Sequence, residues 1–169
     1  MSGPALRQKD AHHAIHEAAR NEAEEITLVL RHALKAQDSN LALETAFILI
    51  EHWETRTLRH AESEETGLYR EIEEQYPHKA PDIRILERDH ALMRILLDDI
   101  KQILYTSGPN ALVLTHFEAM ILLVGIHSRE EEKRLLPVES LAIRSQEVEL
   151  DETLVTEAQN FVEAKRLAT

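Results

Sequence analysis

The sequence predicts an all-α protein, an up-down-up-down antiparallel four-helix bundle with one extra C-terminal helix. The chain of 169 residues has only 4 glycines and 5 prolines, and it is rich in Ala, Leu, Glu, Ile and Arg, which are common in long helices. Apolar residues recur at helical spacing over long stretches, and no stretch alternates as a β-strand does. Short turn-forming segments separate these stretches, so successive helices are expected to pack antiparallel.

The first two helices are predicted over about residues 8–36 and 41–75. The sequence Gln-Asp-Ser-Asn at 37–40 breaks the helical pattern between them. Asn40 is placed to cap the second helix, because an Asn side chain accepts hydrogen bonds from the free amide groups of a first turn. The second helix is predicted as a single element.

The third and fourth helices are predicted over about residues 82–105 and 111–136. Two prolines in the segment 76–81 disrupt helix before the third. Thr-Ser-Gly-Pro-Asn at 106–110 is a strong turn signal before the fourth. The fourth stretch is the most apolar, as expected of a helix buried on much of its circumference.

A C-terminal extension is predicted beyond the fourth helix. Pro137 ends or kinks that helix, and a weaker amphipathic helix follows at about residues 151–167. We therefore expect one four-helix bundle domain at residues 8–137 and an extension at residues 138–169 that contains the one amphipathic helix. A single domain agrees with the chain length.

The composition narrows the range of functions. A formal net charge of −12 repels nucleic acid and anionic membrane, so neither is expected as a partner. The absence of cysteine excludes disulfides, thiolate metal sites and thiol redox chemistry. The longest apolar run, residues 119–126, is far shorter than the ~20 residues that span a bilayer, and the first residues do not resemble a signal peptide. A cytoplasmic location is expected.

Ten histidines are unusual in this composition, and two of them belong to a repeat. The pattern H-x-x-x-E-E-x-x-L occurs once with His60 and Glu64 and once with His127 and Glu131. Residues at i and i+4 lie on one helix face, about 6 Å apart along the axis. Each pair can therefore reach one metal cluster from a single helix. One such pair is usually a solvated surface pair, but two copies at equivalent places in two helical hairpins favour a shared site.

The hairpin geometry selects two further histidines. Residues equidistant from the turn of an antiparallel hairpin lie at the same level, because both helices rise by about 1.5 Å per residue. His16 lies as many residues before Asp38, in the first turn, as His60 lies after it. His90 likewise lies as far before the turn at residues 108–109 as His127 lies after it. His12 and His13 remain alternatives to His16, at about one turn of error.

Four histidines and two glutamates at one level of a bundle predict a dinuclear metal site. Imidazole suits iron, zinc and copper, and bridging carboxylates suit a pair of hard cations. A metal would also offset the cost of burying the two carboxylates. The predicted ligands are His16, His60, Glu64, His90, His127 and Glu131.

This pattern resembles the hemerythrin-like, HHE-type cation-binding domains over roughly residues 8–137. The family pattern has a lone His on helix one, His-x-x-x-Glu on helix two, a His on helix three, and His-x-x-x-Glu or His-x-x-x-x-Asp on helix four. The resemblance implies a non-heme centre of two iron ions held by the six residues named above, with other divalent metals as alternatives. Oxygen-carrying hemerythrins have a second histidine on helix three, but Leu86 and Arg94 occupy the positions one turn either side of His90. This four-His, two-Glu version resembles iron-cluster repair di-iron proteins, although their cysteine-containing N-terminal segment has no counterpart here.

The missing imidazole leaves more open positions on the metals. We expect a protein that binds or handles a small diatomic molecule (oxygen or nitric oxide), peroxide, or iron itself. Its role would be in stress response, sensing or iron handling. A di-iron enzyme that decomposes peroxide, a reversible oxygen-binding hemerythrin and a metal-free helical interaction module are the alternatives. A monomer or small homo-oligomer is expected.

Overall fold

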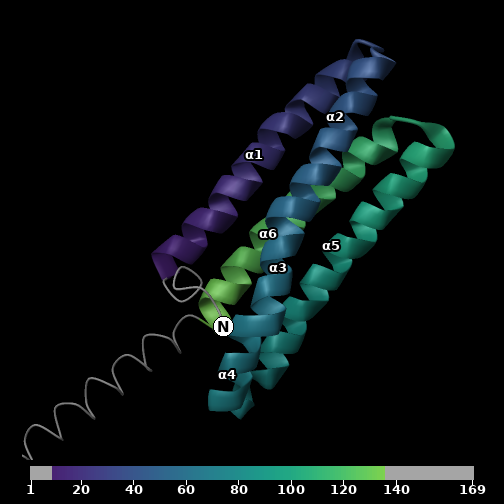
Figure 1. Ribbon diagram of the computed structural model, residues 1–169. Coiled ribbons are helices and arrows are strands. Elements are labelled where there is room, and N and C mark those ends of the chain that lie inside the picture. The colour runs from purple at the N-terminus through teal and green to yellow at the C-terminus, as the bar shows by residue number, and fades with distance from the viewer. Residues whose placement is uncertain (1–8, 136–169) are drawn as a thin grey trace, which may run out of the picture. The chain divides into compact units, whose positions relative to one another are not determined.

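The computed structural model describes residues 9–135, and in this part every regular element is a helix (Figure 1). Four long helical segments are present, which confirms the all-α prediction for this part of the chain. The predicted extension at residues 138–169, with its amphipathic helix, lies outside the described residues, as does Pro137. The elements in order are α1 (Lys9–Lys35), α2 (Ser39–His52), η2 (Trp53–Leu58), α3 (Arg59–Ser63), η3 (Glu64–Leu68), α4 (Tyr69–Gln75), η4 (Pro77–Lys79), α5 (Ala80–Ser107) and α6 (Ala111–Arg134).

Neighbouring helices pack in pairs. α1 lies along α2, and α5 lies along α6, as Figure 1 shows. α1 also packs against α6, which joins the two hairpins. The helices that carry the two predicted halves of the metal site are therefore in contact.

The turns differ in detail from the sequence prediction. The cap of α2 is Asp38 and not Asn40, because the Asp38 carboxylate accepts a 3.0 Å hydrogen bond from the amide of Leu41 and the helix already begins at Ser39. Gln37 just before it has a positive φ of 56°. α5 begins at Ala80, inside the predicted loop, since a proline is tolerated in the first turn of a helix.

The second hairpin turn has the predicted chemistry. Gly108 has a φ of 67°, a backbone conformation that strains any side chain with a Cβ atom. Asn110 then caps α6 by accepting hydrogen bonds from the amides of Leu112 and Val113, at 2.8 and 3.4 Å. These two residues explain why the chain reverses here.

The segment predicted as one helix at 41–75 is interrupted twice. Two π-helical segments, η2 and η3, lie on either side of the short helix α3 that carries His60. A π-helical turn holds more residues than an α-helical turn, so it rotates the next residues of the chain around the helix axis. The apolar spacing of a sequence does not reveal such an insertion. π-Bulges are frequent at functional sites, and Glu64 is the first residue of η3.

Two apolar clusters divide the core. The larger one includes Leu49 and Trp53 with Met93 and Met120, and the smaller one includes Leu68, Ile83 and Leu135. Along each of the second, third and fourth helical segments, the predicted ligands occur between the residues of these two clusters. The predicted ligands thus form a largely buried polar layer between two apolar ones.

One helix in the described part, α6, is long and apolar enough to cross a membrane by length and composition. The core helix of a water-soluble bundle meets the same test. α6 packs against both α1 and α5, and its last turns carry buried His127 and Glu131. Only 33% of its apolar window is buried, and Leu112, Leu122 and Ile126 are exposed, so α6 is less buried than the sequence predicts.

Candidate metal centre

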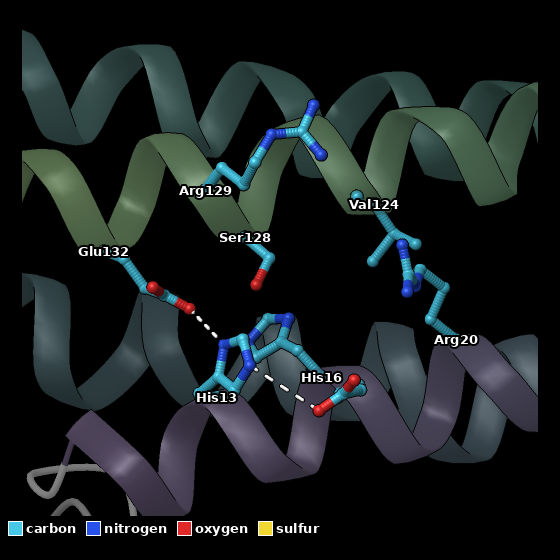
Figure 2. A pocket seen from close by; sticks show the side chains of 9 residues that line it. His13, His16, Arg20, Val124, Ser128, Arg129 and Glu132 are labelled. Atoms are coloured by element: carbon cyan, nitrogen blue, oxygen red, sulfur yellow. Dashed lines mark hydrogen bonds and ion pairs between the residues drawn. The ribbon is translucent and has the colours of Figure 1, made fainter.

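The first predicted ligand, His16, lies on α1 and is buried. Its Nε2 atom lies 3.0 Å from Nε2 of His60 on α3. The alternative His13 is exposed, and its ring pairs with Glu132 and Glu17 instead (Figure 2). The side chain of His12 lies outside the described part of the chain. The structure thus brings His16, and not His13, beside His60.

The second histidine pair comes from the other hairpin. Nε2 of His90 on α5 and Nε2 of His127 on α6 lie 3.0 Å apart. Both side chains are almost completely buried. In each hairpin, the two histidines that lie equally far from the turn come together across two helical segments.

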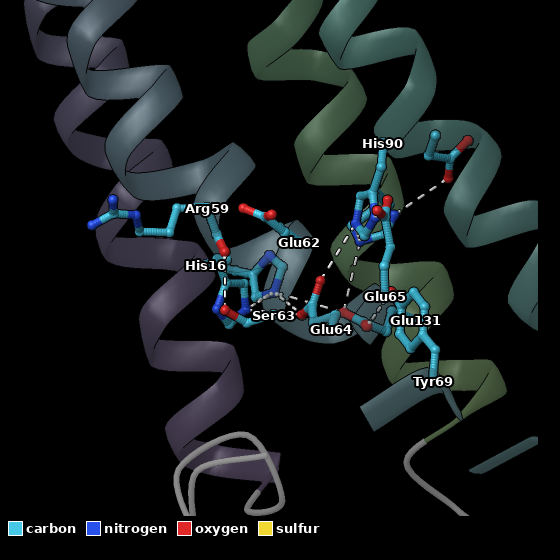
Figure 3. Close-up of polar contacts among 12 residues, drawn as sticks. His16, Arg59, Glu62, Ser63, Glu64, Glu65, Tyr69, His90 and Glu131 are labelled. Atoms are coloured by element: carbon cyan, nitrogen blue, oxygen red, sulfur yellow. Dashed lines mark hydrogen bonds and ion pairs between the residues drawn. The ribbon is translucent and has the colours of Figure 1, made fainter. Parts of the chain in front are cut away.

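Glu64 lies between the two histidine pairs (Figure 3). Its Oε1 atom lies 2.9 Å from Nε2 of His60 and 3.3 Å from Nε2 of His16. Its Oε2 atom lies 3.4 Å from Nε2 of His90. Two groups able to hold a metal ion share this carboxylate: one consists of His16, His60 and Glu64, and the other of Glu64, His90 and His127.

Glu131 on α6 also lies against both pairs. Its Oε2 atom is 3.6 Å from Nε2 of His16 and 3.8 Å from Nε2 of His127. Its Oε1 atom accepts a 2.6 Å hydrogen bond from the hydroxyl of Tyr69. One oxygen of this carboxylate thus faces the cluster while a phenol holds the other.

The donor chemistry of the cluster suits a cation. Nδ1–H of His90 donates a 2.9 Å hydrogen bond to Glu65, which directs the lone pair of its Nε2 atom toward His127. Two imidazole nitrogens 3.0 Å apart need a proton or a metal ion between them. Glu64 and Glu131 are fully buried, and a buried carboxylate is costly to keep charged unless a cation is near. This set of imidazole and carboxylate donors can hold metal ions.

An ion pair behind His90 fixes the orientation of its ring. Arg94 donates two hydrogen bonds to Glu65, of 2.9 and 3.0 Å, and Glu65 accepts the bond from His90. Burial alone would raise the pKa of Glu65, but the hydrogen bonds from Arg94 and His90 and the Arg94 charge hold that pKa below its usual value. Glu65 therefore stays ionised and keeps Nδ1 of His90 as the donor. No role was predicted for Glu65 from the sequence.

Tyr69 closes the other side of the centre. It is buried, its ring stacks on His90 at a centroid distance of 5.9 Å, and its hydroxyl is bound to Glu131. Burial first, and then the nearby charges of Glu64 and Glu131, raise the pKa of Tyr69 well above its usual value of 10.0. The phenol therefore remains a hydrogen-bond donor.

The remaining polar neighbours have separate roles. Asp89, the direct neighbour of His90 in sequence, lies 3.5 Å from Nδ1 of His127 on the adjacent helix.

Two further histidines make contacts outside the cluster. His52 donates a 2.9 Å hydrogen bond to the carbonyl of Ala19 and so links α2 to α1. His116 donates to the carbonyl of Leu112 within α6, at 2.8 Å. The contacts of His52 and His116 are therefore structural.

The repeat itself contained a signal for one missed residue. In both copies of H-x-x-x-E-E, the second glutamate accepts a hydrogen bond from a histidine of another helix: Glu65 from His90, and Glu132 from His13. The spacing alone shows that this glutamate lies next to the predicted ligand. It does not show which helix it faces.

Comparisons of the chain with models of known protein families, with curated proteins and with solved structures find no match. Over residues 9–135 every regular element is a helix, and a buried histidine and glutamate cluster there is able to hold a metal and is compatible with a hemerythrin-like site.

Proposed function

We propose that this chain is a hemerythrin-like non-heme di-iron protein, folded as an up-down-up-down four-helix bundle. It binds or handles oxygen, nitric oxide, peroxide or iron itself, in stress response, sensing or iron handling. The observation that carries the proposal is the position of buried Glu64, which presents one oxygen to each of two imidazole pairs. A carboxylate so placed is suited to bridge two cations.

The six predicted residues divide between two metal positions. His16 and His60 would hold one ion, and His90 and His127 the other, with Glu64 shared between them. Glu131 lies within 4 Å of both pairs and would complete the set. Two bound irons would supply oxidation and reduction together with open positions for a small molecule. Iron is proposed from the resemblance, since the donor set also accepts other divalent metals.

The surroundings of His90 favour small-molecule or iron handling over reversible oxygen carriage. Leu86 is buried in the smaller apolar cluster, and Arg94 is held by Glu65. Neither can supply the second helix-three imidazole that oxygen-carrying hemerythrins use. The centre is therefore richer in carboxylate and has more open positions, which favours reaction with oxygen over its stable storage.

Metal analysis tests the proposal directly. The full chain, purified without chelators, is expected to contain two irons by elemental analysis. His60→Ala and His127→Ala should each lose most of this iron. His116→Ala is the matched control, because His116 lies outside the cluster and its ring is hydrogen-bonded to Leu112 of its own helix, and it should keep the full amount. Unchanged iron in both site variants, or no bound metal in the parent protein, contradicts the proposed centre.

The small-molecule role needs a second experiment. Reduced, iron-loaded protein should be oxidised when mixed with oxygen and should change its spectrum with peroxide or nitric oxide. A stable oxygenated spectrum that is reversed by removing oxygen would instead identify an oxygen carrier. Rapid catalytic loss of peroxide would favour the enzyme alternative.

A further inference from the structure

The two proposed metal positions differ in how accessible they are. The side chains of His60 and His16 are 14% and 6% exposed, whereas those of His90 and His127 are 2% and 1% exposed. Among these four imidazoles, His16 and His60 thus lie nearer to solvent. A molecule that enters from outside would therefore reach the His16 and His60 side of the centre first.

A cavity between α1 and α6 leads to this side. Its volume is about 210 Å³, and His16 is the one predicted ligand among its lining residues (Figure 2). Pockets for drug-sized organic ligands usually measure ~300–1,000 Å³. This cavity is smaller, so it suits a small inorganic molecule with some water.

Two guanidinium groups lie near Gly125, one of the residues that line this cavity. A Cβ atom placed on Gly125 would lie 3.6 Å from Nη1 of Arg20 and 3.8 Å from Nη1 of Arg129. Both cations therefore lie within 4 Å of one point on α6, where the glycine leaves space. Arg20 has Glu24 at 3.7 Å, while within residues 13–135 no carboxylate is within ion-pair distance of Arg129.

The two acidic residues that line the cavity, Glu17 and Glu132, both contact His13. Glu132 accepts a hydrogen bond from His13, and Glu17 lies 3.6 Å from the same ring. In Figure 2, His13 and Glu132 lie toward one end of the cavity and Arg20 lies toward the other. Ser128, between them, adds a hydroxyl to the wall.

We propose that this cavity is a binding site for a small inorganic anion on its way to the metal centre, with Arg20 and Arg129 as the anion-binding residues. The inference rests on the proposed di-metal function and specifies the charge of the molecule that the centre takes. The chain as a whole has a net charge of −12 and repels anions, so a local pair of cations is needed to bring one to His16.

Azide is a suitable probe, since it is a small anion of one charge. Its binding to the oxidised, iron-loaded full chain is measured by calorimetry and by absorption. Arg129→Gln should weaken the affinity about tenfold, and Arg129→Lys, which keeps the charge, should restore most of it. Arg20→Gln should weaken it as well. Nitric oxide, which is uncharged, should bind reduced Arg129→Gln protein as it binds the parent.

Arg59→Gln is the matched control. Arg59 lines a second cavity, of about 610 Å³, whose wall also includes His60 and residues of α1. Its loss should leave azide affinity unchanged. An equal affinity in Arg129→Gln and the parent, or a loss confined to Arg59→Gln, overturns the proposal.

Iron content separates this inference from the proposed function. All four arginine variants should hold the same iron as the parent. Full iron with unchanged azide affinity refutes the anion site alone. A parent chain that holds no metal refutes the proposed function, and the anion site falls with it.

Discussion

The hydroxyl of Tyr69 donates a 2.6 Å hydrogen bond to Oε1 of Glu131 in the buried layer between the two apolar clusters. Tyr69 lies on α4, just after the second π-helical segment, and Glu131 lies near the end of α6. The bond therefore links the second and fourth helical segments at the level of the candidate metal centre. It also fixes which oxygen of Glu131 faces the histidines.

Tyr69→Phe should lower the free energy of unfolding of the metal-loaded protein by about 1–3 kcal/mol. The change removes a donor to a buried carboxylate and leaves the ring in place. Urea unfolding followed by circular dichroism measures this effect. Tyr105→Phe is the control, because Tyr105 is 88% exposed and should show no change. A Tyr69→Phe protein as stable as the parent would mean that the bond does not contribute to folding.

Glu65→Gln should weaken iron binding about 10- to 100-fold, since the carboxylate orients the imidazole of His90 through a 2.9 Å hydrogen bond. Competition with a chelator of known affinity measures the change. Arg94→Gln should have a smaller effect in the same direction, because it leaves Glu65 in place. Glu73→Gln, which removes a surface ion pair with Arg84, serves as the control. Iron affinity equal to that of the parent in Glu65→Gln would exclude this orienting role.

Removal of metal should destabilise the parent protein. A ligand that binds only the folded state, at a free concentration ~1,000 times its Kd, stabilises it by about 4 kcal/mol. The Tm measured by calorimetry is therefore expected to fall on chelation and to recover when iron is returned. In His60→Ala, chelation should change the Tm much less. A Tm that is indifferent to chelation in the parent would show that folding and metal binding are not coupled.

The ion pair between Asp82 and Arg134 predicts a pH dependence away from the centre. Hydrogen bonding by Arg134 is the main cause that holds the pKa of Asp82 below its usual 3.8, with Lys79 adding to it. Because the pKa is lower in the folded state, the pair stabilises the fold above about pH 4, and this contribution disappears as the pH falls through the folded-state pKa. The pair is partly exposed, and solvent screening keeps this contribution small.

Paired urea titrations at pH 7 and pH 3 test this sign. The difference in unfolding free energy between the parent and Asp82→Asn should be largest at pH 7 and should shrink at pH 3. Asp98→Asn, at an aspartate whose side chain is 78% exposed, is the control. A difference that grows as the pH falls would contradict the assignment.

Much of the helix arrangement could be predicted from residue patterns. α1 and α6 begin and end within two residues of their predicted bounds, because long apolar periodicity and the turn at residues 106–110 are local signals. The two π-helical segments around α3 could not be predicted in this way. A π-helical turn holds one more residue than an α-helical turn, so it rotates every later residue about the helix axis. The residue types in such a turn are those of an ordinary α-helix, so the sequence does not mark it. The cap at Asp38 was missed for a related reason, since Asn40 has the same capping chemistry two residues later.

The sequence by itself determined that two His-x-x-x-Glu pairs would each lie on one helix face, and the turn positions selected His16 and His90 to lie level with them. Such relationships follow from the rise and the rotation per residue, which are the same in every α-helix. Only the tertiary structure decided that Glu64 faces both imidazole pairs, that Glu65 orients His90, and that Tyr69 holds Glu131. These contacts depend on how each helix is rotated about its own axis, and that rotation is set by the packing of the whole core.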